Sequence, residues 1–213
     1  MDLGNQMRIA ELLASRLCHD VVGPIGAVNN GMELLHDGDL DMADDALKLA
    51  AQSAQQAADL LQYYRLAYGL AGHRQGGDLK PMHDLAVRFF THHKASLDWS
   101  ANAMPNGLPE SAGKLILNML LLAGEALPRG GTVGVLFAED AGAHEIAVVA
   151  VGADAGLREE TRAGLADDVP VAELTPRSVQ PYFTKHLVRA MDGRLEVEAV
   201  GPGQLRLTAR LPA

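Results

Sequence analysis

Two long stretches near the start of the chain have the hydrophobic pattern of amphipathic helices. Apolar residues recur in steps of three and four from residue 9 to residue 35, and again from residue 40 to residue 68, which is the spacing of one buried helix face. The segment Gly23-Pro24-Ile25-Gly26 interrupts the first stretch, and an interior proline costs a helix about 3 kcal/mol. The apolar positions nevertheless stay in phase across it. We expect one helix that bends near Pro24; the alternative is that these four residues end one helix and a second begins near Ala27.

The second stretch predicts how the two helices pair. Leu40, Leu47 and Leu61 lie in its apolar seam with alanines between them, and small seam residues let two helices approach closely. A helical hairpin with one apolar side cannot bury that side alone, so we expect two chains to form a four-helix bundle, which makes the protein a homodimer. A monomer is the alternative, if the C-terminal half covers the seam. Residues 1–72 are predicted to form this helical domain.

The remainder of the chain predicts a second domain over residues 78–213. The glycine-rich segment 71–77 has the composition of a linker, and helix and strand patterns alternate after it. Helices are expected at residues 79–94, 110–127, 158–167 and 178–191, and strands at residues 97–101, 132–139, 145–151, 195–200 and 204–211. This order predicts an α/β sandwich in which helices cover one face of a mixed sheet, so the whole chain is expected to be α+β.

His19 is the side chain of the first helix that the hydrophobic pattern singles out. It lies two residues after Leu17, or roughly 200° around the helix from the apolar stripe, so its imidazole is expected to face solvent. Ser15, Gly23 and Gly26 share this face, and their small side chains leave room for another protein to approach the ring. The imidazole is a nucleophile whose neutral form is abundant near neutral pH. An exposed His on a bare helix face is therefore a candidate carrier of a phosphoryl group.

The residues around His19 resemble two related groups of signalling proteins. Residues 16–28, RLCHDVVGPIGAV, resemble the H box of histidine kinases, in which an acidic residue and, a turn later, a proline follow the His. The resemblance is closer to the alphaproteobacterial histidine phosphotransferases of the ChpT type, whose pattern CHD-(V/I)-x-GP-x-GA-(I/V)-NNG is matched through Gly31. It extends from about Ala10 to the end of the chain, and it implies a His-bearing helical bundle joined to a degenerate ATPase-like domain.

The second domain resembles the ATP-binding domain of histidine kinases, with informative departures. Asn118 matches the first Asn of the N box, but Leu122 stands where a second Asn would hold magnesium. Asp154 and Gly156 are what remains of the adenine-reading Asp-x-Gly-x-Gly motif. Residues 178–183 replace the glycine-rich phosphate loop and contain a proline, which has no N–H to donate. A kinase without these groups cannot stabilise the charge on a transferring phosphoryl group, so we expect no ATP-driven autophosphorylation and no bound nucleotide.

The resemblance to the ChpT type implies a phosphorelay role and the partners that go with it. Members accept a phosphoryl group from the receiver Asp of a CckA-like hybrid kinase and pass it to the receiver Asp of CtrA-like or CpdR-like response regulators. The phosphoacceptor here would be His19. Asp20 would orient its ring or accept its proton, and Arg16, one turn earlier, would stabilise the phosphoryl oxygens. Magnesium would be supplied by the partner receiver domain, so the chain itself would need no cofactor.

Composition and charge exclude several other classes of function. The formal net charge of −9 argues against nucleic-acid binding, which selects for basic surfaces. No apolar run approaches the roughly 20 residues of a membrane span, and residues 1–8 lack a signal-peptide pattern, so we expect a soluble cytoplasmic protein. Cys18 is the single cysteine, and we interpret it as a buried or neutral helix residue rather than as a reactive thiol.

Two groups of residues raise the question of a metal site. Residues 36–45 are acidic, but Met42 stands where a calcium loop needs Gly and Lys48 where it needs Glu, so we expect a solvated turn. His83, His92 and His93 fall on or near one predicted helix, but no Cys or carboxylate completes a ligand set, so we interpret them as surface histidines. No metal site is predicted.

Three hypotheses remain at this point. The first is a histidine phosphotransferase without kinase activity, acting through a phosphohistidine intermediate. The second is a divergent but active histidine kinase, which predicts ATP binding. The third is a non-catalytic scaffold that binds receiver domains, and it predicts that a His19→Gln variant keeps full biological function.

Overall fold

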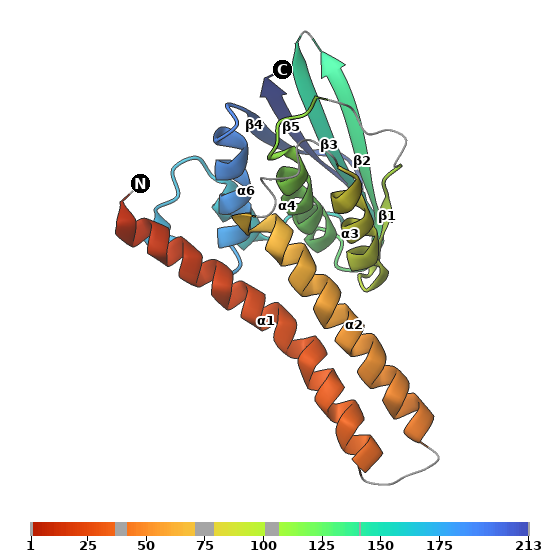
Figure 1. Ribbon diagram of the computed structural model, residues 1–213. Helices are drawn as coiled ribbons and strands as arrows, with labels where there is room; N and C mark the ends of the chain where they lie inside the picture. The colour runs from red at the N-terminus through yellow and green to blue at the C-terminus, as the bar shows by residue number, and fades with distance from the viewer. Residues whose placement is uncertain (1, 37–41, 71–78, 101–106, 141, 213) are drawn as a thin grey trace.

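The computed structural model describes residues 2–36, 42–70, 79–100, 107–140 and 142–212. A long helical hairpin joins a sheet that is covered by helices on one face (Figure 1). The helices are α1 (Leu3–His36), α2 (Ala43–Ala67), α3 (Lys80–Thr91), α4 (Ala112–Glu125), α5 (Glu159–Leu165), the short 3-10 helix η3 (Val171–Glu173) and α6 (Val179–Arg189). The strands are β1 (Ala95–Asp98), β2 (Gly131–Asp140), β3 (Ala143–Val151), β4 (Arg194–Gly201) and β5 (Gln204–Pro212). The expected α+β class, with N-terminal helices and a C-terminal mixed sheet, is confirmed.

Helix α1 is continuous through residues 23–26, which contain two glycines and a proline. Pro24 lies inside the helix, so the alternative of a new helix starting near Ala27 is wrong. The close approach of the two helices occurs further along, at Gly31, where an added Cβ would lie 2.8 Å from the carbonyl oxygen of Ala46 and 3.0 Å from the Cβ of Ala50. The prediction that small residues bring the helices together is therefore confirmed.

The seam predicted on α2 is buried at some positions and exposed at others. Two of its alanines, Ala50 and Ala57, are buried along the hairpin, together with Ala46 and Ser53. Leu47 of the predicted seam is 59% exposed and Leu61 is 45% exposed. These two leucines are thus left uncovered by this chain.

The second domain has two layers. Its sheet has the strand order β1-β2-β3-β5-β4, with β1 parallel to β2 and the other neighbours antiparallel. Helices α3, α4 and α6 lie on one face, between the sheet and the base of the hairpin (Figure 1). Residues 112–124 of α4 are all buried, since this helix is enclosed by the sheet and by its neighbouring helices. The predicted α/β sandwich is confirmed.

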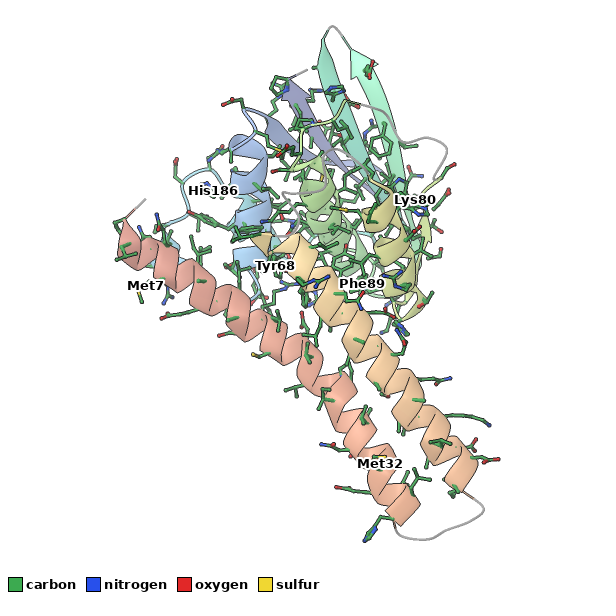
Figure 2. The ribbon with its side chains drawn as sticks, viewed as in Figure 1. Met7, Met32, Tyr68, Lys80, Phe89 and His186 are labelled. Atoms are coloured by element: carbon green, nitrogen blue, oxygen red, sulfur yellow. The ribbon has the colours of Figure 1, made fainter. Side chains whose placement is uncertain are left out.

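The helical hairpin contacts the second domain through α2 and through the N-terminal part of α1. Figure 2 shows Tyr68 and Phe89 where α2 meets the helices of the second domain, and the Tyr63 hydroxyl donates to the carbonyl of Leu117 at 2.8 Å. Near its N-terminus, α1 is held by Arg8, which donates to the carbonyls of residues 171, 172 and 174 in and after η3, at 3.0–3.2 Å. This part of the second domain was not predicted. The predicted linker 71–77 and residues 37–41 of the predicted turn at 36–45 lie outside the described residues.

Candidate functional site

His19 lies in the middle of α1 with its imidazole in solvent. Its side chain is 85% exposed, as the helical pattern predicts. Ser15 and Gly23 are exposed on the same side, and apart from its chain neighbours and the backbone of α1 itself, a Cβ added at Gly23 or Gly26 would have no heavy atom within 4 Å. Both glycines are therefore unnecessary for packing within the described part of the chain, and the face around the ring is open.

Asp20 contacts the imidazole directly. Its Oδ1 lies 3.1 Å from Nδ1 of His19. An ionised carboxylate can only accept, so this contact requires the proton of a neutral imidazole to be on Nδ1. The other ring nitrogen, Nε2, then carries a free lone pair and is the nucleophilic atom. The contact with Asp20 therefore favours the tautomer of His19 that carries its proton on Nδ1.

The second oxygen of Asp20 is held from two sides. The Tyr64 hydroxyl of α2 donates a short hydrogen bond to Oδ2, and Nε of Arg16 lies 3.8 Å from the same oxygen. Burial is the main reason why the pKa of Tyr64 is raised far above its usual value, so its hydroxyl stays protonated and remains a donor at neutral pH. Tyr64 stacks on Tyr68 with ring centroids 5.0 Å apart. No motif had singled out Tyr64.

Arg16 links the hairpin to the second domain. Its side chain is only 9% exposed and forms a short ion pair with Glu125 at the end of α4. Its charge is therefore shared between two carboxylates, Glu125 and Asp20. The structure brings the three predicted site residues, Arg16, His19 and Asp20, together on one side of α1, with Arg16 buried beneath the exposed imidazole.

A cavity of about 560 Å3 opens beside His19, between α1 and the second domain. Helix α1 contributes Ser15, Arg16, His19 and Asp20 to its lining, α4 contributes Glu125, and the segment 158–177 contributes Arg158 and Arg177. Arg177 pairs with Glu160 at 3.4 Å, and both are exposed. The residues from the second domain were not predicted, because no local pattern relates positions 158–177 to a helix more than a hundred residues earlier.

The residues that resemble kinase motifs have partners within the chain. Asn118 is fully buried and its amide donates to the carbonyls of Ala67 and Lys114 at 2.8 and 2.9 Å. Gln180 of α6 donates to the backbone carbonyl of Asn118 at 2.9 Å. Asp154 lies at the surface, 2.9 Å from Arg129. The side chain of Asn118 is therefore used inside the fold.

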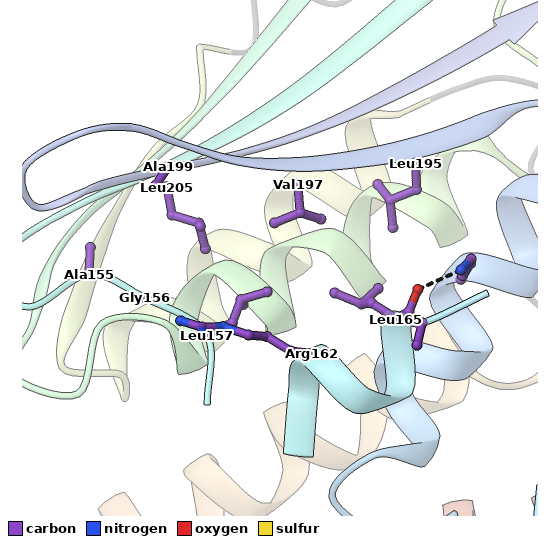
Figure 3. A pocket seen from close by; sticks show the side chains of 11 residues that line it. Ala155, Gly156, Leu157, Arg162, Leu165, Leu195, Val197, Ala199 and Leu205 are labelled. Atoms are coloured by element: carbon purple, nitrogen blue, oxygen red, sulfur yellow. Dashed lines mark hydrogen bonds between the residues drawn. The ribbon is translucent and has the colours of Figure 1, made fainter. Parts of the chain in front are cut away.

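A second cavity, of about 470 Å3, lies away from His19 and between β4, β5 and α5 (Figure 3). Leu195, Val197 and Leu205 point into it from the two strands, with Arg162 on the opposite side. At one end Lys185 donates to the carbonyl of Leu165 at 2.5 Å. Gly156, from the remnant of the adenine-reading motif, lines this cavity.

The remaining candidate residues have ordinary structural partners. Cys18 is exposed, so of the two structural interpretations, a buried or a neutral helix residue, burial is wrong. His83 lies 3.0 Å from the carbonyl of Trp99, and His93 accepts from the amide of Ala95 at 3.1 Å. Both rings are half-buried rather than on the surface, because each packs against an aromatic side chain. Among the described residues, no group of three or more His, Cys, Asp or Glu is arranged to hold a metal.

Comparisons with known proteins place this arrangement in a family. Residues 80–203 match the family described as the histidine phosphotransferase C-terminal domain. The protein phosphotransferase ChpT of Brucella abortus (strain 2308) is 33% identical over 197 residues, which are 90% of this chain and 90% of that protein. The chain belongs to the histidine phosphotransferase family. The solved structure of a bacterial phosphotransferase matches with a TM-score of 0.80 and 30% identity, over 95% of this chain and 96% of the other.

This histidine phosphotransferase also has a weaker structural neighbour. The histidine kinase AdeS of Acinetobacter baumannii matches with a TM-score of 0.46 and 12% identity, which is too low to carry an argument. The segment matched to the family, residues 80–203, does not include His19. The assignment of His19 therefore rests on its own sequence motif and on the geometry described above. No helix in the described ranges is long and apolar enough to cross a membrane.

Proposed function

We propose that His19 is the phosphoacceptor of this histidine phosphotransferase, and that the protein works in a phosphorelay. The observation that carries the proposal is an imidazole that is 85% exposed, whose Nδ1 is 3.1 Å from a carboxylate oxygen. A nucleophilic nitrogen is thereby directed into solvent, where the phosphorylated side chain of another protein can reach it. His19 also lines a cavity to which both parts of the chain contribute.

The reaction proposed is reversible transfer between an aspartyl phosphate and His19. The lone pair on Nε2 attacks phosphorus, an N–P bond forms, and the P–O bond to the aspartate breaks with its electron pair left on the carboxylate. The Nδ1 proton stays on the ring, hydrogen-bonded to Asp20, whose negative charge stabilises the cationic phosphoimidazolium. Asp20 thus orients the ring and balances its charge.

Arginine side chains of the cavity would stabilise the phosphoryl group. Arg16 lines the cavity, where its positive charge favours a nearby anion. Its ion pair with Glu125 fixes the position of the guanidinium group. Arg158 and Arg177 enter from the second domain and are exposed. These two guanidinium groups suit the acidic surface that surrounds the phosphorylated Asp of a receiver domain.

The proposed partners are receiver domains of two kinds. The donor would be the receiver of a CckA-like hybrid histidine kinase, and the acceptors would be CtrA-like and CpdR-like response regulators. The receiver would also bring the magnesium ion that transfer requires. The bare helix face at Gly23 and Gly26 supports this proposal, because a second protein can approach His19 without meeting side chains.

We also propose that the working unit is a homodimer with a four-helix bundle. Ile25 and Met32 on α1 are 45% and 55% exposed, and Leu47 and Leu61 on α2 are 59% and 45% exposed. Within each pair the spacing is a multiple of seven residues, so each pair lies on one line along its helix. Exposed apolar lines on both helices of one hairpin are the surface that a second hairpin would cover.

Transfer of labelled phosphate from a phosphorylated receiver tests the proposed function. We expect label on the wild-type protein, none on a His19→Gln variant, and none on either protein when ATP is the only donor. Label from ATP alone would support the divergent kinase instead. A wild-type protein that binds the receiver without taking up label would support the scaffold.

A further inference from the structure

Tyr64 is buried in α2, on the side that faces the phosphoacceptor helix. Its hydroxyl donates to Oδ2 of Asp20, while Oδ1 of the same carboxylate contacts Nδ1 of His19. The order of contacts is therefore Tyr64, Asp20, His19. Tyr64 does not itself touch the imidazole in any of the contacts given by the structure, so any effect it has on the reaction must pass through Asp20.

We propose that Tyr64 is a positioning residue for phosphoryl transfer, which holds Asp20 so that His19 is kept as the Nδ1-protonated tautomer with Nε2 free. The proposal rests on the proposed function of His19 as the phosphoacceptor. It assigns to the second helix of the hairpin a direct part in preparing the nucleophile.

The geometry of a helix explains why Asp20 needs to be held. Side chains at consecutive positions of a helix point about 100° apart, so Asp20 reaches His19 only in rotamers that turn its carboxylate toward the ring. A carboxylate that turns freely would spend part of its time in water. The Tyr64 hydroxyl donates to Oδ2, and the charge of Arg16, whose Nε lies 3.8 Å away, attracts the same oxygen. Together they direct Oδ1 toward Nδ1.

Tyr64 is suited to this task because it is immobile and neutral. Tyr64 is 3% exposed, and its ring stacks on that of Tyr68 with an angle of 13° between the two planes. Burial and the neighbouring Tyr68 raise the pKa of its hydroxyl, so the proton needed for the bond to Asp20 is present at any physiological pH. A rigid donor limits the carboxylate more than a flexible one would.

The consequence for the reaction is a larger population of the reactive tautomer. Free imidazole exchanges its proton between Nδ1 and Nε2, and only the form with the proton on Nδ1 offers a lone pair on Nε2. In the transfer step that lone pair forms the bond to phosphorus, the P–O bond to the donor aspartate breaks, and its electron pair stays on the aspartate. The Nδ1 proton is neither lost nor gained, and it remains in the bond to Asp20.

The neighbouring residue Tyr63 provides a matched control. Tyr63 is also fully buried and its hydroxyl also makes one hydrogen bond, to the carbonyl of Leu117 at 2.8 Å. Tyr63 is therefore similar to Tyr64 in burial and in its single hydroxyl hydrogen bond. Among the contacts that the structure gives, it has none with Asp20. Tyr63→Phe and Tyr64→Phe each remove a single oxygen atom and leave the aromatic ring in place.

The experiment compares these two variants with the wild-type protein by two measurements. The first is the nitrogen-15 NMR spectrum of the His19 ring, which reports the fraction of each tautomer. The second is single-turnover transfer from a phosphorylated receiver domain, over a range of receiver concentrations. For Tyr64→Phe we expect an increased Nε2-protonated fraction and a maximal rate lowered about tenfold, with the half-saturating receiver concentration unchanged. For Tyr63→Phe we expect wild-type values of both.

A double-mutant comparison removes the remaining ambiguity. In an Asp20→Ala background, Tyr64→Phe should cause no further change in rate, because the positioned carboxylate is already absent. The proposal is overturned if Tyr64→Phe leaves tautomer and rate unchanged, if Tyr63→Phe causes the same loss, or if the two losses add. A wild-type protein that takes no phosphate would overturn the proposed function instead, and the NMR measurement would still decide whether Tyr64 positions the ring.

Discussion

Replacing Gly26 by Ala is expected to stabilise the protein and to slow phosphoryl transfer. Gly26 lies in the interior of α1, two turns after His19 and on the same side of the helix. Selection for stability alone would favour alanine at such a position. One added methyl group is thus expected to raise stability and to weaken partner binding, which distinguishes a glycine kept for folding from one kept for a partner.

The expected gain in stability follows from the space around Gly26. Alanine is better than glycine in a helix interior by about 1 kcal/mol, and apart from the two chain neighbours and the backbone of α1 itself, no heavy atom would lie within 4 Å of the new Cβ. No clash offsets the gain. For a chain of this size, about 1 kcal/mol corresponds to a rise of roughly 2–4 °C in Tm.

The expected loss in transfer follows from the partner that we propose. A methyl group inserted into a close protein contact costs about 1–3 kcal/mol, and about 1.4 kcal/mol corresponds to a tenfold change in an equilibrium constant. The half-saturating concentration of the phosphorylated receiver should therefore rise roughly fivefold or more. Gly23 is left unchanged in this test, because Pro24 follows it and a Cβ on the residue before a proline disfavours the helical conformation.

The assay combines thermal unfolding with transfer kinetics, and Gly31→Ala serves as the control. A Cβ at Gly31 would meet the Ala46 carbonyl at 2.8 Å, so this variant should lower Tm. The reasoning is refuted if Gly26→Ala raises Tm while transfer keeps its wild-type concentration dependence, because the space beside Gly26 would then not be used by a partner. A lowered Tm for Gly26→Ala would mean that part of the assembled protein covers this face.

Two further predictions concern assembly and pH. Replacing Met32 and Leu47 together by Glu should convert the dimer to a monomer in light scattering with the helical content retained, because both side chains are exposed in the single chain; a dimer that persists would mean that another surface pairs the chains. Burial lowers the pKa of His93, so the folded state disfavours the protonated ring, whereas the unfolded chain takes up a proton near pH 6.5. The free energy of unfolding measured in urea should therefore be level above about pH 6.5 and fall as the pH drops below it toward the lower folded pKa. The His93→Asn variant keeps an acceptor for the amide of Ala95, and its free energy of unfolding should fall less steeply as the pH drops. An unchanged slope would contradict the attribution of this pH dependence to His93.

Helical and strand periodicity were sufficient to predict the elements of this fold. Nine predicted helices and strands of the second domain and the hairpin's exposed His19 all follow from patterns within a few neighbouring residues. Such patterns report which residues share a face. Pro24 did not break α1 because the apolar positions on either side of it stay in phase, so packing against α2 supports both halves.

Contacts between elements could not be predicted in the same way. Asp20 and Tyr64, which are 44 positions apart, meet only because α2 is rotated so that Ala46 and Ser53 face α1. Leucine is more apolar than alanine, and pattern reasoning therefore placed Leu47 in the seam. Arg16 and Glu125 are 109 positions apart, and their pairing depends on how the two parts of the chain dock. The short helix η3 has too few residues to show a period.

The most direct test of the account is the site at which phosphate is carried. A receiver domain phosphorylated on its Asp would be mixed with the protein, and the modified residue mapped by mass spectrometry under neutral conditions that preserve phosphohistidine. The account predicts an acid-labile phosphoryl group on His19, absent from His19→Gln and returned to a fresh unphosphorylated receiver. Phosphate on another residue, or none on a protein that binds the receiver, would contradict it.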